Sequence, residues 1–118
     1  MQILIADDEK EVVEMMRGFL SRRGFSVNIA FDGAKALEAI ETNKYDLVFL
    51  DESMPELTGL EIVKRIRENH DKPKIVMVTG YSAIKEDFAK LVGVDDYIEK
   101  PIDLEKIEEI IDKYKKGG

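Results

Sequence analysis

The chain has no cysteine and no tryptophan, and it has only three prolines and a single histidine, His70. Without cysteine, disulfides, thiol catalysis and cysteine-based zinc sites are excluded. One histidine cannot form a multi-histidine metal site. No apolar run approaches the roughly 20 residues that a membrane-spanning helix requires. The first ten residues, MQILIADDEK, turn acidic too early for a signal peptide. We therefore expect a reduced, cytoplasmic protein with no membrane partner.

Positive charge is also scarce, because 18 lysines and arginines stand against 25 aspartates and glutamates, which gives a net charge of −7. This balance argues against direct binding of nucleic acid by the chain. Of the 118 residues, 44% are hydrophobic and 36% are charged, a composition typical of globular proteins. We expect a single domain over residues 1–118, in which Lys115–Gly118 form a linker or chain end.

Short apolar runs alternate with segments of helical spacing along the whole chain. Two of the runs, Leu47–Leu50 and Ile75–Val78, are continuously apolar, as in strands that are covered on both faces. The alternation predicts βαβ units in an α/β, doubly wound parallel sheet with helices on both faces. The predicted strands are Gln2–Ala6, Ser26–Ala30, Asp46–Leu50, Lys74–Val78 and Asp96–Ile98.

Five helices are expected between and after these strands. The first spans about Glu9–Arg23 and the second about Gly33–Asn43. The third begins with a capping box of Thr58 and Glu61. Ile84, Phe88 and Leu91 are predicted as the apolar face of the fourth helix, which ends at Gly93. The fifth helix is expected to start after Asp103, and its apolar face is formed by Leu104, Ile107, Ile111 and Tyr114.

Polar residues follow four of the five predicted strands. Asp7, Asp8 and Glu9 follow the first, Asp51 the third, Thr79 the fourth and Lys100 the fifth. Each alone could be a helix cap or a surface residue, but a parallel sheet brings all of them to one edge. Clustered carboxylates without histidine or cysteine suit Mg²⁺ or Mn²⁺. A lysine and a hydroxyl would bind phosphoryl oxygens, and a remaining carboxylate could act as a nucleophile.

Four segments then resemble the receiver domain of response regulators in bacterial two-component signalling. They are ILIADDE, DLVFLDESMPELTGLEIVKRIRE, IVMVTGYS and DDYIEKPID, and together they extend from Ile3 to Asp103. The resemblance implies a flavodoxin-like (βα)5 fold whose strand order is 2-1-3-4-5. It also implies a phosphoacceptor that takes a phosphoryl group from a histidine kinase or a phosphotransfer protein and thereby switches a signalling surface. Such a protein is not an enzyme, although it assists its own phosphorylation and dephosphorylation.

The resemblance assigns roles to individual residues. Asp51 would be the phosphoacceptor, and it would share a Mg²⁺ ion with Asp8 directly and with Asp7 mostly through water. The backbone carbonyl of Ser53 would be a further ligand to the metal.

Further roles concern the response to phosphorylation. Thr79 would bind a phosphoryl oxygen, and Lys100 would pair with Asp51 or its phosphoryl group. Tyr97 occupies the position of the aromatic residue that turns inward on activation, with a fixed edge-strand residue as the alternative. The Lys100–Pro101 peptide bond would be cis.

Three positions depart from the common family pattern or would affect the rate of autodephosphorylation. Gly80 stands where the family usually has alanine. Ser53 and Tyr81 flank the path of the attacking water; Tyr81 would shield the phosphoryl group and Ser53 would do little to orient water. We therefore expect slow autodephosphorylation.

Partner surfaces follow from the same resemblance. A downstream effector domain or protein would bind the face of the fourth helix, fifth strand and fifth helix. Phosphorylation could also produce a homodimer. Val13 and Met15, at the rims of the first helix, would contact a kinase or form the edge of the core. His70 is expected at the surface, away from the acidic edge, and not as a phosphorelay histidine.

Three other functions compete with this interpretation. A haloacid-dehalogenase-type phosphatase needs a second aspartate two residues after its nucleophile, where this chain has Ser53. A flavin or nucleotide module needs a phosphate-binding loop after the first strand, where this chain has acidic residues. The alternative that stays open is a pseudo-receiver, which would act as a protein-interaction module without phosphorylation.

Overall fold

The computed structural model of the chain describes residues 1–70, 72–80 and 85–116. Its five parallel strands form one sheet in the order β2-β1-β3-β4-β5, as the family resemblance implied. The strands are β1 (Gln2–Ala6), β2 (Ser26–Ala30), β3 (Leu47–Asp51), β4 (Lys74–Thr79) and β5 (Asp96–Glu99). The helices are α1 (Lys10–Arg22), α2 (Gly33–Thr42), α3 (Gly59–Arg67), α4 (Glu86–Val92) and α5 (Leu104–Lys116).

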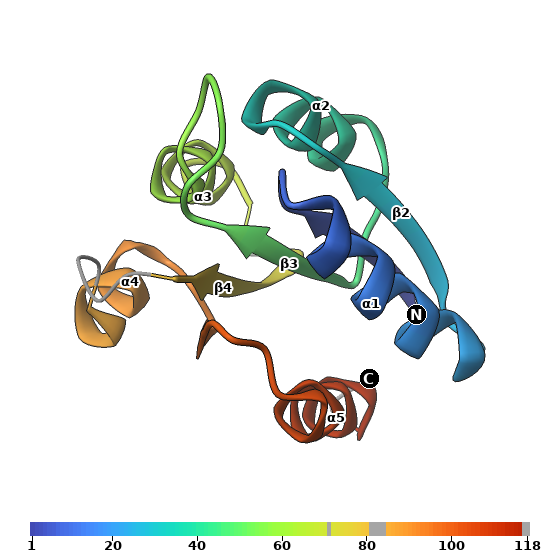
Figure 1. Ribbon diagram of the computed structural model, residues 1–118. Helices are drawn as coiled ribbons and strands as arrows, with labels where there is room; N and C mark the ends of the chain where they lie inside the picture. Colours follow the sequence, from blue (N-terminus) through green and yellow to red (C-terminus); the bar gives the residue numbers. More distant parts are fainter. Residues whose placement is uncertain (71, 81–84, 117–118) are drawn as a thin grey trace.

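The sheet is covered on both faces, as expected for continuously apolar strands (Figure 1). Helices α1 and α5 pack on one face, and α2, α3 and α4 pack on the other. Successive side chains of a strand point to opposite faces, so each central strand contributes to both cores. In β3, Leu47 and Phe49 belong to the core under α1 and α5, whereas Val48 and Leu50 belong to the core under α2, α3 and α4.

Helix ends confirm several local predictions. The Thr58 hydroxyl accepts a hydrogen bond from the Glu61 backbone N–H, and the Glu61 carboxylate accepts one from the Thr58 N–H, which completes the predicted capping box at α3. Gly93 ends α4 with φ of 128°, a conformation that favours glycine. The Asp103 carboxylate accepts a hydrogen bond from the Glu105 N–H in the first turn of α5.

The predicted apolar face of α4 is wrong for the residues that the structure describes. Phe88 is 53% exposed and Leu91 is 84% exposed, while the small Ala89 is buried against the sheet. Ile84, the third residue of the predicted face, lies outside the described residues. A helix of seven residues offers two competing apolar stripes, and side-chain size alone does not decide which one faces the core.

The two residues predicted at the rims of the first helix differ in exposure. Val13 is fully buried in the core under α1, which confirms the alternative that it belongs to the core, whereas Met15 is 38% exposed. The prediction of a linker from Lys115 needs correction. Lys115 and Lys116 belong to α5 and not to a linker, because the helical pattern continues through them. Residues 117 and 118 lie outside the described residues. His70 is exposed just after α3, as predicted.

Strands in the structure extend one residue further at their carboxyl ends than predicted for β3, β4 and β5. Asp51 and Thr79 are therefore the last residues of β3 and β4, paired in register with Val78 and Glu99. Ladder hydrogen bonds thus hold the backbone of both residues. In the part of the chain that the structure describes, no helix combines the length and apolar character needed to cross a membrane.

Close packing beside Asp51 predicts a large effect of one methyl group. A Cβ atom added at Gly59 would lie 2.8 Å from the Asp51 carbonyl oxygen, whereas one added at Gly18, in the middle of α1, meets nothing closer than 3.9 Å. We expect Gly59→Ala to lower the free energy of unfolding by about 1–3 kcal/mol. The matched control Gly18→Ala should raise it by about 0.5–1 kcal/mol. Urea unfolding of both variants tests this, and an unchanged midpoint for Gly59→Ala would contradict it.

Candidate functional site

The residues predicted at the strand ends meet at one edge of the sheet. Asp7 and Asp8 follow β1, Asp51 and Thr79 end β3 and β4, and Lys100 follows β5. The neighbouring connections cross to opposite faces here, since β1 lies between β2 and β3. Asp7, Asp51 and Thr79 are each only 3% exposed, and they are the buried polar side chains among the described residues.

Three carboxylates approach one another closely enough to share a cation. One oxygen of each of Asp7, Asp8 and Asp51 lies within 4.8 Å of the others. Asp8 is exposed, so the cluster opens to solvent on its side. Hard oxygen ligands of this kind, with water completing the shell, match the preferences of Mg²⁺ and Mn²⁺. The donor set therefore fits the predicted metal.

Lys100 supplies the positive charge at this edge. Its Nζ lies 3.1 Å from Asp7 Oδ2 and 3.7 Å from Asp51 Oδ1, and it also contacts the Glu9 carboxylate. Burial alone would lower the pKa of Lys100, but hydrogen bonds to Glu9 and Asp7 outweigh it and raise that pKa. The lysine therefore stays charged.

The predictions did not include Glu9 as a partner of Lys100. Glu9 is the residue before α1, and its side chain is largely exposed. The sequence feature that could have indicated this contact is the position of Glu9 directly after two aspartates at the end of a strand. The ammonium group consequently lies nearer to Glu9 and Asp7 than to Asp51.

Asp51 is held in a state that resists ionisation. Burial, followed by the charge of the nearby Asp7, raises the pKa of Asp51 to about 7, although Lys100 and the Ser53 N–H act in the opposite direction. Burial is also the main reason that the pKa of Asp7 is raised. A cation bound among these groups would remove this repulsion.

A small polar cavity of about 190 Å³ adjoins Asp51. Its lining consists of Asp8, Glu9, Asp51, Ser53, Gly80 and Lys100. Gly80 leaves space beside Lys100, because an added Cβ there would lie 3.8 Å from the lysine side chain. The cavity thus gives a small anion access to both the Asp51 carboxylate and the Lys100 ammonium.

The remaining predicted residues lie around this cavity or behind it. Ser53 lines the cavity and donates its N–H to Asp51 Oδ1 at 3.4 Å; its carbonyl as a metal ligand stays a prediction. Tyr97, in β5, is half-buried against the core under α2, α3 and α4. The Lys100–Pro101 peptide bond is cis, as predicted, and Lys72–Pro73 is a second cis bond that was not predicted. Tyr81 lies outside the described residues.

A family model described as the response regulator receiver domain matches residues 3–112. The chain belongs to this family. Among curated relatives, the transcriptional regulatory protein DltR of Streptococcus agalactiae is 39% identical over 108 residues, which are 91% of this chain and 48% of the relative. Response regulator MprA of a Mycobacterium species is 41% identical over 107 residues, 90% of this chain and 46% of the relative. The chain thus spans about half the length of these relatives.

Solved structures agree with this assignment. The receiver domain of response regulator 1452 from Francisella superposes with a TM-score of 0.90 at 28% identity, covering 99% of this chain and 98% of the other. TrrA from Thermotoga maritima, solved in complex with Mg²⁺-BeF, gives a TM-score of 0.86 at 32% identity and covers 96% and 97% of the two chains. Both neighbours are response regulator structures, and each covers at least 96% of the present chain.

The raised pKa of Asp51 makes stability depend on pH. The folded-state pKa of about 7 exceeds the ordinary carboxyl value, so the folded receiver binds the proton more tightly than the unfolded chain. The contribution of Asp51 to the free energy of unfolding should be greatest near pH 4 and should fall as the pH rises to about 7. Asp51→Asn removes this contribution, and without metal the variant should be more stable than the parent by roughly 2 kcal/mol above pH 7.

Urea unfolding in EDTA between pH 4.5 and 8.5 measures this difference. The exposed Asp112→Asn, on α5, is the matched control and should follow the parent at every pH. A parallel pH dependence in the parent and Asp51→Asn would contradict the burial of an ionisable Asp51.

Proposed function

We propose that this receiver domain accepts a phosphoryl group on Asp51 from the phosphohistidine of a sensor histidine kinase or phosphotransfer protein. The observation that supports this most directly is the position of Asp51. It is a buried carboxylate at a strand end, 3.7 Å from a lysine and open to a small polar cavity. In this proposal the reaction takes place in the cytoplasm.

Asp7, Asp8 and Asp51 would hold the Mg²⁺ ion, for which Mn²⁺ can substitute, and the Ser53 carbonyl would complete the protein ligands. When bound, the metal neutralises charge on the phosphoryl oxygens. The family relative TrrA was solved with Mg²⁺-BeF, which supports such a site in this chain as well. Burial, together with the charge of Asp7, raises the pKa of Asp51, and this gives the cluster a physical reason to bind a cation.

In the transfer itself, Asp51 is the protein group that forms a covalent bond, and the other site residues position groups and neutralise charge. An Asp51 carboxylate oxygen forms a bond to phosphorus as the bond between phosphorus and the donor imidazole nitrogen breaks, and the electron pair stays on the imidazole. Lys100, which stays protonated, leaves Glu9 and Asp7 to pair with the new phosphoryl oxygens. Water later hydrolyses the acyl phosphate and restores the Asp51 carboxylate. The receiver is therefore a signalling phosphoacceptor that promotes its own modification.

In this proposal, residues of β4 and β5 transmit phosphorylation to a signalling surface. In this proposal the buried Thr79 hydroxyl bonds the phosphoryl group, and Tyr97 turns into the space beside β4 and β5. The face of α4, β5 and α5 then binds an effector domain or protein, or a second phosphorylated copy. Phe88 and Leu91, both exposed on α4, add apolar area for such a partner.

Phosphorylation by a small-molecule phosphodonor tests the proposal. We expect the intact mass to show one added phosphoryl group with Mg²⁺ and none after EDTA. Without the cation, the carboxylates of the acidic cluster would repel the negatively charged phosphoryl group. Asp51→Asn should stay unmodified, whereas Asp112→Asn should be modified like the parent. A folded parent that gains no mass would favour the phosphorylation-independent pseudo-receiver.

Metal binding can be measured without the reaction. Because Mg²⁺ binds the folded carboxylate cluster, it should stabilise the parent by about 1.4 kcal/mol at ten times its dissociation constant. Asp8→Asn, which removes the exposed ligand, should abolish most of this gain without disturbing the buried core. Thermal unfolding with and without Mg²⁺ provides the measurement, with Asp112→Asn as control. Equal stabilisation of Asp8→Asn and the parent would exclude Asp8 as a ligand.

A further inference from the structure

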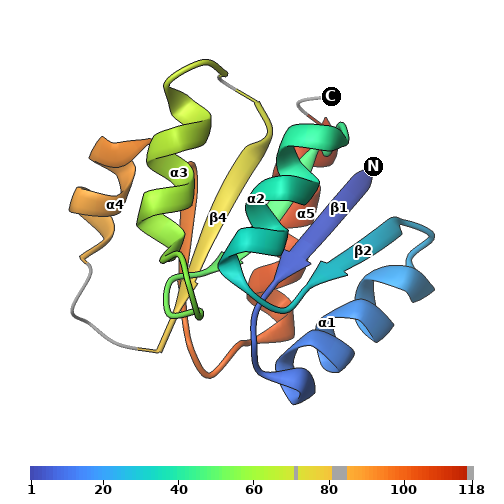
Figure 2. The same ribbon diagram turned by 90° about the horizontal axis from the view of Figure 1, so that it is seen from above.

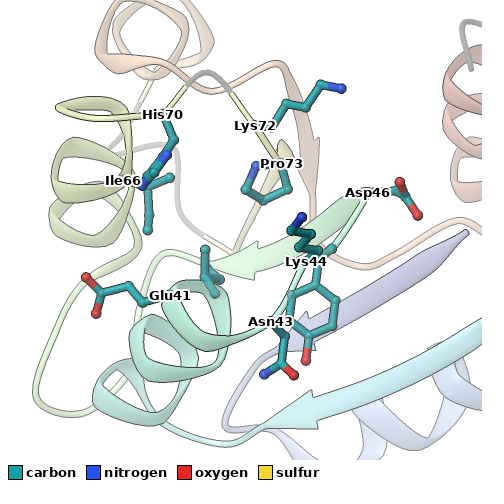
Figure 3. Close-up of a pocket in the computed structure, with 10 residues that line it drawn as sticks. Glu41, Asn43, Lys44, Asp46, Ile66, His70, Lys72 and Pro73 are labelled. Atoms are coloured by element: carbon teal, nitrogen blue, oxygen red, sulfur yellow. The ribbon is translucent and has the colours of Figure 1, made fainter.

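Two hollows adjoin at the opposite edge of the sheet, where the strands begin. The first has a volume of about 700 Å³ and lies between the ends of α2 and α3 and the residues before β3 and β4 (Figure 3). The second, of about 500 Å³, lies between the start of β1 and the end of α5, which share this edge (Figure 2). Tyr45, Asp46 and Lys72 line both hollows, so together they form one elongated depression, here called the basal groove.

Positive charge is concentrated in the basal groove. Among the described residues that line it are five lysines and two carboxylates, Glu41 and Asp46, in a chain whose net charge is −7. One Asp46 oxygen already accepts a hydrogen bond from the Gln2 N–H at 2.7 Å. The lysines are Lys44, Lys72, Lys74, Lys113 and Lys115.

Three of these lysines are available to a ligand. Lys74 and Lys113 pair with Asp95 and Asp96, at 3.7 and 3.1 Å. Lys44, Lys72 and Lys115 are exposed and form no ion pair with a carboxylate in the described ranges of the chain. The charge of the groove therefore complements an acidic partner.

The floor of the groove is apolar. Ile40, Ile66 and Pro73 are buried beneath the first hollow, and Tyr45 is only 8% exposed. The Tyr45 hydroxyl is already satisfied by the Asn28 side-chain amide, which donates to it at 2.8 Å. A ligand that reaches this floor would thus contact carbon atoms, while its charged groups meet the lysines at the rim.

We propose that the basal groove binds an acidic, extended segment of a partner protein, which inserts an apolar side chain into the hollow between α2 and α3. Carboxylates on either side of that anchor would face Lys44, Lys72 and Lys115. Two adjoining hollows that share lining residues favour an extended peptide over a compact anion. Nucleic acid fits less well, because its continuous phosphates would also meet Glu41 and Asp46 and its backbone offers no apolar side chain for the hollow.

The position of the groove gives it a role separate from phosphorylation. The parallel strands begin beside the basal groove and end beside the acidic cluster that contains Asp51. The two sites therefore lie at opposite edges of the sheet. A bound segment would leave the acidic edge open to a kinase. The groove would therefore tether the receiver to a partner whether or not Asp51 is phosphorylated.

Binding of a capped hexapeptide, Glu-Leu-Glu-Glu-Leu-Glu, to the unphosphorylated receiver tests this proposal by isothermal titration and by amide NMR shifts. We expect shifts confined to residues that line the groove. Lys44→Glu with Lys72→Glu should weaken binding about tenfold. Lys64→Glu with Lys106→Glu, an equal charge change on exposed positions of α3 and α5, should change it less than about twofold.

Other outcomes would overturn the proposal. Equal weakening by the two double variants would show that net charge alone governs binding. Equal affinity for a peptide with glycine in place of leucine would exclude the apolar floor. Binding of the parent to phosphatidylglycerol vesicles but not to the peptide would identify a membrane surface as the occupant. Lys44→Gln with Lys72→Gln, checked by circular dichroism, replaces the reversal variant if that variant unfolds, and it too should weaken binding.

Discussion

Lys100 stands among the carboxylates of Asp7, Glu9 and Asp51, and the organisation of the acidic edge depends on this single cation. Two of those carboxylates are buried, so each ionised oxygen there has lost most of its hydration. One lysine does not compensate for the whole cluster, and the pKa of Asp51 remains raised. The ionised form of these buried carboxylates is consequently unfavourable, and a bound metal ion would stabilise it.

The sheet supplies the rigidity that this arrangement needs. Asp51 and Thr79 end strands that are paired on both sides, with apolar cores above and below them. Gly59 allows the backbone of α3 to approach the end of β3 closely. By contrast, α4 buries only Ala89 among its residues, fewer than α1, α2 or α3 bury, so a helix of the proposed output face is weakly anchored. A fixed reaction site beside a weakly held helix suits a switch.

The two edges of the sheet differ in charge as well as in position. Carboxylates dominate where the strands end, and lysines line the groove where they begin. Under the two proposals above, this electrostatic division would separate a partner that brings a phosphoryl group from a partner that brings carboxylates. The two binding surfaces would then not compete.

The sequence by itself determined the α/β alternation, most element boundaries, the strand-end residues and the capping box at Thr58, because these depend on local periodicity and on residues close in the chain. Only the tertiary structure decided that Val13 is core, that Phe88 and Leu91 are exposed and that Glu9 contacts Lys100. The basal groove is likewise built from segments far apart in sequence. Such features depend on the orientation of each helix against the sheet and on contacts between charged residues far apart in the chain. The local sequence pattern determines neither of these.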